Sequence, residues 1–421
     1  MQTSILDNRS LVAEPLSPGK PKAAGAGRTM VIGVAEDLKI EVFDRMEPLE
    51  TEWRRLQRDS FTSLHQGYDW CDAWVRSHGH PLAILRGTIA GETCFILPLE
   101  IVTVRSVRIA RYIASPFNNI NNGLFTPTFR ARCSAQVARS VAQAIVRALG
   151  GHADLVSLQN MPLDWRGERH PFAALPSVEN QNHAFQLTLA ADMEATIRQL
   201  NAKRRRKVYR SQCRKIEAHG GFEHVVAETD TEKAAMIDLF FRQKAVRFDA
   251  HGLPNVFRPC EIQAFFRSLL QVAPEDCDTP LQLHAIRLNG ENDGKIAAIA
   301  GLSRKNDHVI CQFGSIDEHL VPDTSPGELL FFLMIEKVIG EGAAIFDFGV
   351  GDQGYKRRWC TIETVQHDVL LPVSAKGRIA AAGLQLVTRT KAAIKRHPTL
   401  YAFIQRLRAR AAKEPTGESE G

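Results

Sequence analysis

The residues with the clearest chemical potential begin at Ser325-Pro-Gly-Glu-Leu-Leu330. Ser325 can cap a helix, Pro326 suits the first helical turn, and Gly327 lets another group approach the backbone closely. The N–H groups and the dipole at the start of such a helix attract anions and suit a pyrophosphate. The motif therefore indicates an anion site, although the same residues also suit an ordinary capped helix.

A glycine-rich segment with acidic and aromatic side chains follows at 345–359, Ile-Phe-Asp-Phe-Gly-Val-Gly-Asp-Gln-Gly-Tyr-Lys-Arg-Arg-Trp. Asp347 lies in an alternating, strand-like stretch, where a structural role and a functional role are equally open. Asp352 lies in the loop, and loops on rigid scaffolds commonly carry function. Tyr355 and Lys356 come next, and Tyr355 suits a packed ring as well as a functional hydroxyl.

The same segment contains Gly349-Val-Gly351-Asp-Gln-Gly354, which matches the dinucleotide-binding fingerprint and precedes Asp368 at a suitable distance. That fingerprint must open a helix. The following stretch, 355–365, is short, carries β-branched residues and continues into a strand. We therefore expect no such helix and no nucleotide-binding half.

A strongly basic run lies between positions 203 and 215, and no acidic residue interrupts residues 201–215. Its members are Lys203, Arg204, Arg205, Arg206, Lys207, Arg210, Arg214 and Lys215. At helical spacing they cover more than one face, which suits either solvation or an anionic substrate such as a nucleotide sugar, a lipid phosphate or an acidic polysaccharide. Nucleic acid ranks lower, because Tyr209 is the one aromatic residue of the run that could stack on bases.

The elements that would position these residues follow from the spacing of apolar residues. In the first half we expect strands at 38–43, 82–88, 93–102, 107–113 and 154–158, with helices at 48–58, 68–77 and 134–149. In the second half we expect strands at 184–190, 221–227, 281–288, 295–303, 307–315, 344–348 and 366–371, with helices at 192–218, 231–249, 260–272 and 326–339. This order indicates an α/β (α+β) fold of mostly antiparallel sheets flanked by helices.

The expected organisation is a disordered leader at 1–36, lobes at 37–180 and 181–375, a basic helical tail at 376–413 and a disordered end at 414–421. Of the 421 residues, 44% are hydrophobic and 24% charged, which suits a globular chain and excludes a wholly disordered or collagen-like one. Eight scattered cysteines without a Cys-x-x-Cys pair favour a reduced, cytoplasmic setting and give no metal pattern. The basic tail suits either packing back on the lobes or the anionic inner face of a membrane.

The strand at 307–315, the Ser-Pro-Gly-Glu-Leu-Leu helix and the Phe-Asp-Phe-Gly-x-Gly-Asp-x-x-Tyr-Lys segment together resemble the BioF2-like acetyltransferases. That family is also described as CelD (BcsL)-like in cellulose biosynthesis. It belongs to the GNAT superfamily and is related to the FemAB peptidoglycan-bridge transferases. The basic run and the spacing of Trp53, Tyr68, Trp70 and Trp74 fit the same family, and the resemblance covers roughly residues 38–375.

This resemblance implies two tandem GNAT-like lobes, with acetyl-CoA or another acyl-CoA held by the second lobe. The donor's thioester would lie between two splayed strands, and its pyrophosphate would meet a helix start. Cys311, Gln312, Phe313 and Gly314 would line the acyl arm. Ser325, Pro326, Gly327, Glu328 and Leu329 would form the pyrophosphate turn, which has one glycine where the general GNAT pattern has more.

The resemblance also implies roles in acyl transfer. Asp352, or else Asp347, would take the acceptor's proton, and Tyr355 would protonate the leaving thiolate. Lys356 would bind an anionic acceptor, as would the three consecutive arginines Arg204, Arg205 and Arg206. The predicted reaction moves an acyl group to an amine or hydroxyl of an anionic, polysaccharide- or cell-envelope-linked acceptor. The alternatives are a FemAB-like transferase that takes its donor from tRNA, and a non-catalytic accessory protein of polysaccharide biosynthesis.

Overall fold

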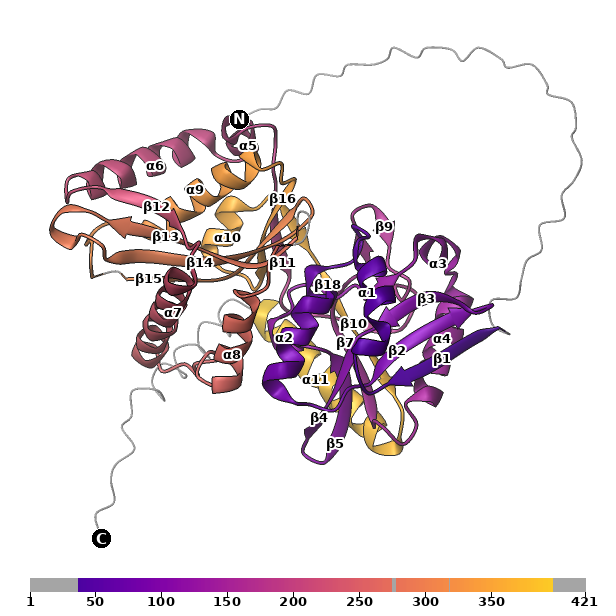
Figure 1. Cartoon of the computed structure of the whole chain (residues 1–421). Helices are drawn as coiled ribbons and strands as arrows, with labels where there is room; N and C mark the ends of the chain where they lie inside the picture. The colour runs from indigo at the N-terminus through magenta and orange to yellow at the C-terminus, as the bar shows by residue number, and fades with distance from the viewer. Residues whose placement is uncertain (1–36, 275–277, 318, 397–421) are drawn as a thin grey trace, which may run out of the picture. The chain divides into compact units, whose positions relative to one another are not determined.

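Two sheet-and-helix lobes make up the described chain, which comprises residues 37–274, 278–317 and 319–396 in the computed structural model (Figure 1). The expected leader at 1–36, the expected end at 414–421 and the tail beyond Arg396 lie outside these residues. The predicted mixture of mostly antiparallel sheets and covering helices is confirmed.

The first lobe contains two sheets that share a kinked strand. Pro98 separates β3 from β4, and because proline has no N–H to donate, the strand expected at 93–102 divides there between the two sheets. The first sheet has the order β1 (Leu38–Phe43), β2 (Ile84–Ile89), β3 (Glu92–Leu97) and β6 (Leu124–Phe125). The second has the order β10 (Ser177–Glu179), β18 (Gln366–Pro372), β7 (Leu155–Pro162), β5 (Val107–Tyr112) and β4 (Leu99–Val104).

Helices cover the first lobe, and a small hairpin extends from it. The helices are α1 (Glu50–Gln57), α2 (Tyr68–His78), α3 (Pro127–Arg132) and α4 (Ala135–Ala148), with 3-10 turns η1 (Glu47–Leu49), η2 (Leu64–Gln66) and η3 (Ser115–Phe117). The hairpin pairs β8 (Asp164–Trp165) with β9 (Glu168–Arg169).

The second lobe has one seven-stranded sheet, and it positions the candidate site. Its order is β12 (Phe222–Val226), β13 (Thr279–Leu288), β14 (Ile296–Lys305), β15 (His308–Ile316), β16 (Ile345–Val350), β11 (Ala184–Thr188) and β17 (Ile362–Thr364). Its helices are α5 (Met193–Arg198), α6 (Ala202–Glu217), α7 (Asp230–Ala250), α8 (Cys260–Leu269), α9 (Pro326–Gly340) and α10 (Gly354–Trp359), with the 3-10 turn η4 (Gly290–Asn292).

Two separate helices, α5 and α6, replace the single helix expected at 192–218. Asp192 accepts a hydrogen bond from the N–H of Ala195, and Asn201 accepts one from the N–H of Arg204. Each residue therefore caps its own helix, and the second cap starts a new helix at residue 202. The basic run lies on α6.

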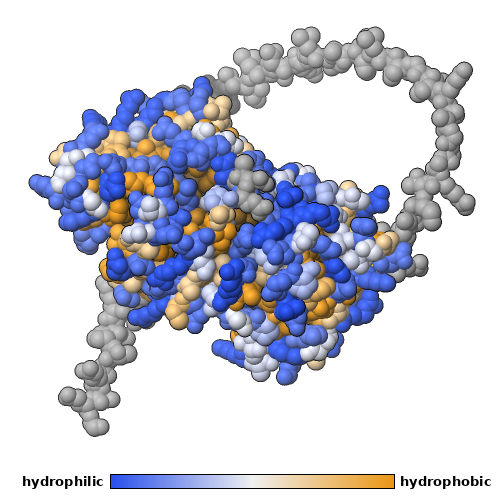
Figure 2. Space-filling view, in the orientation of Figure 1, coloured by the Kyte–Doolittle hydropathy of each residue, from blue (hydrophilic) through white to orange (hydrophobic). Residues whose placement is uncertain are grey.

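The helices of the second lobe cover opposite faces of its sheet (Figure 1). Residues of β14 alternate between two cores: Ile299 packs with the side chains of α7 and α8, whereas Ala298 and Ala300 pack with α9. Figure 2 shows hydrophobic side chains between these two helical layers and hydrophilic ones on the outer faces of the helices. The sheet therefore has one face that packs against α7 and another that packs against α9.

The first lobe takes one strand, β18, from the second half of the chain. β10 pairs with β18 in the first lobe, while β11, the next strand along the chain, pairs with β16 in the second. β17 lies beside β11, and the following strand, β18, returns to pair with β7. Residues 366–375, expected in the second lobe, thus belong to the first lobe's sheet and the start of its helix. The alternating pattern shows that a strand forms there but does not show which strand it will pair with.

The helix α11 (Ala375–Arg396) returns the chain to the first lobe, where it packs on β18, β7, β10 and β5. Gly377 makes this contact possible, because a Cβ at that position would lie 1.7 Å from the carbonyl oxygen of Asp154. The described part of the expected basic tail is therefore helical and docked along its first turns. No helix among the described residues is long and apolar enough to cross a membrane.

We predict that Gly377→Ala destabilises the protein by about 1–3 kcal/mol, because the new methyl group must displace α11 from the sheet. Gly383→Ala on the same helix is the matched control, since a Cβ there meets no atom within 4 Å. The control should raise stability by up to about 1 kcal/mol through helix propensity. Denaturant unfolding of both variants measures the difference, and equal stabilities would mean that the close approach does not hold α11.

Candidate functional site

The strands expected to flank the site, β15 and β16, separate after three residue pairs. They run parallel at His308 with Ile345, Val309 with Phe346, and Ile310 with Asp347, and no further pair joins them. A cavity of about 640 Å³ opens where they diverge. Its walls come from Cys311–Ile316 of β15, from Phe348 and Val350 of β16, and from the first turns of α9.

Gln312 is an extra residue in β15. Gly301 of β14 pairs with Phe313 and Leu302 pairs with Cys311, so Gln312 has no partner across the ladder. Such a bulge releases backbone groups from regular pairing and redirects the side chain. The four residues expected along the acyl arm all line the cavity: Cys311, Gln312, Phe313 and Gly314.

The expected helix forms as α9, and its start is part of the cavity wall. Ser325, Gly327 and Glu328 line the cavity, whereas Pro326 and Leu329 are buried and are not among its lining residues. The Ser325 side chain does not cap the helix; instead its N–H donates to Oε1 of Gln212 on α6. Gly327 lies close to the end of β15, since a Cβ there would come within 3.0 Å of Ile316.

Glu328 links the start of α9 to α6 and α10. Its Oε2 lies 3.0 Å from a guanidinium nitrogen of Arg205 and accepts from the Trp359 indole N–H, and its Oε1 lies 3.1 Å from Arg358. The Arg205 guanidinium also stacks over the Trp359 ring at 4.6 Å. Arg205 is 4% exposed, so it orients Glu328 and cannot contact a molecule in solvent.

The three arginines expected to bind the acceptor together point to different surroundings. Arg205 is buried against Glu328, Arg206 pairs with Glu194 of α5, and Arg204 is exposed. None of them lines the cavity. The expectation of one shared acceptor site at Arg204–Arg206 is not met, because the helical turn separates consecutive side chains by about 100°.

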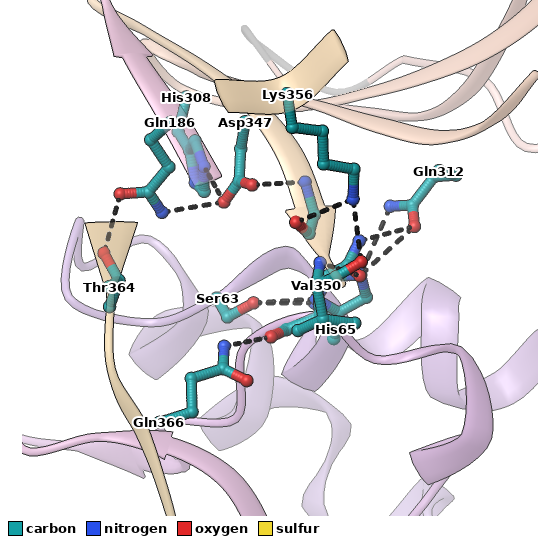
Figure 3. Close-up of polar contacts among 12 residues, drawn as sticks. Ser63, His65, Gln186, His308, Gln312, Asp347, Val350, Lys356, Thr364 and Gln366 are labelled. Atoms are coloured by element: carbon teal, nitrogen blue, oxygen red, sulfur yellow. Dashed lines mark hydrogen bonds and ion pairs between the residues drawn. The ribbon is translucent and has the colours of Figure 1, made fainter. Parts of the chain in front are cut away.

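Asp347 lies in a buried polar cluster beside the three paired residues of β15 and β16 (Figure 3). Its Oδ2 lies 3.2 Å from Nε2 of His308 and accepts from the Gln186 amide at 2.8 Å, and its Oδ1 accepts from the N–H of Gly349 at 2.6 Å. Burial opposes ionisation of this carboxyl, but these hydrogen bonds outweigh burial and hold its pKa below the usual value. Asp347 does not line the cavity, so its interactions support the strand ends.

Asp352, the residue expected to act as the base, lies outside the cavity. Its carboxylate accepts two hydrogen bonds from Arg357, from Nε at 2.6 Å and from Nη2 at 2.7 Å. Both side chains are accessible to solvent, and Asp352 is absent from the cavity wall. The glycine-rich loop therefore directs this carboxylate toward α10 and away from the divergent strands.

Tyr355 and Lys356 both line the cavity, although Lys356 differs from expectation. Lys356, expected to bind the acceptor, is 3% exposed. Its ammonium donates instead to the carbonyl oxygens of Gly349 and Val350, at 3.0 and 2.7 Å (Figure 3). Burial lowers its pKa. Tyr355 stacks on Phe331 at 5.3 Å, and burial raises the pKa of its hydroxyl, which keeps that group protonated at neutral pH.

The helix α10 corrects one sequence expectation. A six-residue helix, Gly354–Trp359, does follow the glycine-rich loop, where none was expected. It leads into β17, which pairs antiparallel with β11. Asp368, the acidic residue of the fingerprint, lies in β18 of the first lobe's sheet. The rejection of a dinucleotide-binding unit thus agrees with the topology, while its supporting argument about the helix was wrong.

Two residues of the first lobe reach this site, and the sequence analysis assigned neither a role. Nε2 of His65 lies 3.2 Å from the side-chain nitrogen of Gln312 (Figure 3). Asn119 contacts both diverging strands, since its Oδ1 accepts from the N–H of Val350 and its Nδ2 lies 3.5 Å from Oε1 of Gln312. The asparagine-rich stretch at 118–122 was the one sequence signal that could have indicated a role for Asn119. No sequence signal indicated a role for His65.

Two parallel strands of the first lobe also diverge, and there a loop of the same lobe fills the space between them. β5 and β7 run parallel at three residue pairs and then separate. The N–H of Asn121 donates to the carbonyl of Asn160 just after this point, and the Asn121 amide donates to the carbonyl of Gln159. Asn160 in turn donates to the carbonyl of Asn118. The loop thus occupies the place that the cavity takes in the second lobe.

Comparisons with known proteins agree with this geometry. Residues 203–357 match the family model described as an acetyltransferase (GNAT) domain. A comparison with curated proteins gives no match. The fold is therefore mixed α/β and GNAT-like, and residues 203–357 are similar to a GNAT acetyltransferase domain.

Solved structures show the same fold over most of the chain. The crystal structure of FemX has 11% identity and a TM-score of 0.54, covering 76% of this chain and 95% of that one. A conserved protein of unknown function from Bacteroides thetaiotaomicron has 11% identity and a TM-score of 0.52, covering 79% and 100%. At such identities the likeness concerns the fold alone, and the narrower BioF2-like (CelD) resemblance stays a prediction.

We predict different outcomes for the two carboxylates. Asp347→Asn should destabilise the protein by about 1–3 kcal/mol, because the new amide N–H₂ would face the Gln186 amide and His308, whose hydrogen bonds Oδ2 now accepts. Asp352→Asn should cost less than about 1 kcal/mol, since it removes a solvent-exposed ion pair. Thermal and denaturant unfolding of both variants test this, and a larger loss for Asp352→Asn would contradict the roles assigned here.

His65 should make stability depend on pH. Burial lowers its pKa to about 4 from a usual 6.5. The unfolded chain therefore binds a proton more readily between these values, so the free energy of unfolding is highest above pH 6.5 and falls as the pH falls toward 4. Between pH 7 and pH 5 the expected contribution is about 2 kcal/mol.

Urea unfolding of the wild type and of His65→Gln at these two pH values measures that contribution. The buried His170, whose pKa is also lowered to about 4, remains in both proteins, so the difference between them isolates His65. Equal pH dependence in the two proteins would exclude His65 as the responsible group.

Proposed function

We propose that this protein is an acyltransferase that takes an acyl group from acyl-CoA, acetyl-CoA first among them, and transfers it to an amine or hydroxyl. The observation that carries the proposal is the divergence of β15 and β16 around a cavity of about 640 Å³ that reaches the start of α9. An extended thioester arm can lie between the strand ends, where no backbone pairing blocks it. The GNAT-type domain at residues 203–357 supports the same reaction class.

The residues around the cavity suit the anionic part of such a donor. The N–H groups at the start of α9 attract a pyrophosphate, and Gly327 leaves that backbone accessible. Glu328 lies in this first turn, but Arg205 and Arg358 offset its charge. Arg358 is also a lining residue and adds a cation at the same mouth.

When bound, acyl-CoA supplies an activated carbonyl, and the chain supplies groups that hold charge and protons. The bulge at Gln312 takes backbone groups out of the ladder, where an N–H can stabilise a developing oxyanion. Tyr355, kept protonated by burial, is the lining residue best suited to give a proton to a leaving thiolate. Among the described lining residues Glu328 is the one carboxylate, and it is engaged by three donors. We therefore assign acceptor deprotonation to water.

The acceptor class remains the one that the resemblance implies: an anionic, polysaccharide- or cell-envelope-linked molecule with an amine or hydroxyl. The tail offers a way to reach such a molecule at an anionic membrane surface. Its described helix, α11, exposes Ile379, Leu386 and Val387 among basic residues. This membrane association is part of the proposal.

A FemAB-like transfer from aminoacyl-tRNA is the second candidate, and the exposed face of α6 favours it. Lys203, Arg204, Lys207 and Arg210 are exposed there. Binding of tRNA through this face should weaken steeply with salt, whereas acyl-CoA binding in the cavity should change little.

We predict that Gly327→Asp reduces CoA affinity at least 100-fold, because the new carboxylate adds bulk and negative charge where a pyrophosphate must approach. Gly340→Asp, at the opposite end of the same helix, is the matched control, since a Cβ there meets no atom within 4 Å. Calorimetry with CoA should show near wild-type affinity for the control. Unchanged affinity in a folded Gly327→Asp protein would remove the start of α9 from the donor site.

A further inference from the structure

Lys244 of α7 lines the same cavity from the face of the sheet opposite α9. α7 packs with the core that contains Phe313 and Ile299, whereas α9 packs with the core that contains Ala298 and Ala300. Because the cavity passes between diverging strands, it includes residues from both faces: Ser325 and Gly327 at the α9 mouth, and Lys244 and Phe257 on the α7 side. The cavity lining therefore extends to both faces of the sheet, and we call its two ends the α9 mouth and the α7 mouth.

The ammonium of Lys244 has an unusual environment for a lysine. It lies 5.8 Å and 5.7 Å from the ring centres of Phe240 and Phe248, on the same helix. Among the described residues, no carboxylate forms an ion pair with it. The guanidinium of Arg247, one helical turn away, lines the same cavity and adds to the positive charge. Burial, with the like charge of Arg247, lowers the pKa of Lys244 to about 8.

A largely buried cation without a carboxylate carries a free-energy cost that an anionic ligand would relieve. Other buried basic side chains of this lobe already have partners: Arg205 pairs with Glu328, Lys305 pairs with Asp278, and Lys356 donates to two backbone carbonyls. Lys244 lines the cavity and, among the described residues, makes no such contact. In the proposed function the donor's pyrophosphate, and the ribose phosphate close to it, lie at the start of α9, so we assign an anion on the α7 side to another molecule.

We propose that Lys244 binds a phosphate or carboxylate group of the acceptor at the α7 mouth. This inference rests on the proposed function and specifies its substrate class: an amine or hydroxyl compound whose anionic group lies a short distance from the reacting atom. It moves the acceptor's anion from Arg204–Arg206, where the sequence suggested it, to the opposite face of the sheet.

Lysine footprinting of the full-length protein tests the site without requiring turnover. Reductive methylation followed by mass spectrometry measures how fast Lys244 reacts, first in chloride and then in inorganic phosphate of equal ionic strength. The matched sugars N-acetylglucosamine and N-acetylglucosamine 6-phosphate are then compared, because neither carries an amine that consumes reagent. Phosphate and the phosphosugar should slow the labelling of Lys244 at least threefold, and this protection should persist with saturating CoA.

Lys244→Met should weaken phosphosugar binding at least tenfold in calorimetry and leave CoA affinity within twofold of wild type. Lys233→Met, on the same helix but paired with Asp230 and outside the cavity wall, should change neither. The inference is overturned if neither anion protects Lys244, or if CoA alone protects it fully, because the lysine would then serve the donor. If CoA fails to bind the wild type, the proposed function fails, yet protection by phosphate still establishes the anion site.

Discussion

The divergence of β15 and β16 is the constraint on which the rest of the site depends. Parallel strands are joined by backbone hydrogen bonds, so a gap between them leaves N–H and C=O groups in need of other partners. Side chains supply these partners at the end of β16: Asn119 accepts from the N–H of Val350, and Lys356 donates to the carbonyls of Gly349 and Val350. The cavity can remain open because its edge is satisfied, and one of the groups that satisfies it comes from the first lobe.

The two lobes share this divergence but use it differently. In the first lobe, the loop around Asn121 fills the gap between β5 and β7 and satisfies its backbone groups. Asn119, in the same loop, projects to the second lobe's cavity. The chain passes between the two sheets twice, from β10 to β11 and from β17 to β18, so the position of Asn119 relative to Gln312 is set by two sheets rather than by one flexible linker. The first lobe thus acts as a support for the site of the second.

The features that the sequence predicted correctly are those set by neighbouring residues. Apolar spacing and Pro326 indicated α9, and the glycines around Asp352 indicated a loop after a buried strand. The features it missed depend on contacts between distant residues. Asp352 pairs with Arg357, and Arg205 pairs with Glu328. Lys244 lines the cavity only because the fold places α7 beside the diverging end of β15. The pairing of β18 in the first lobe was missed for the same reason, since an alternating pattern defines a strand without defining its neighbour.

The arrangement of charge around the gap also constrains the chemistry. The α9 mouth has a helix start and Arg358, and the α7 side has Lys244 and Arg247. Between them, the lining residues Cys311–Ile316 of β15 carry no formal charge, since burial raises the pKa of the Cys311 thiol to about 12. Cations at both ends of a wall that β15 leaves uncharged suit two anionic molecules that meet through their uncharged ends. Transfer of a neutral acyl group from one anionic carrier to another fits this pattern, because β15 adds no charge to the passage and the ammonium of Lys356, which also lines it, is engaged by two backbone carbonyls.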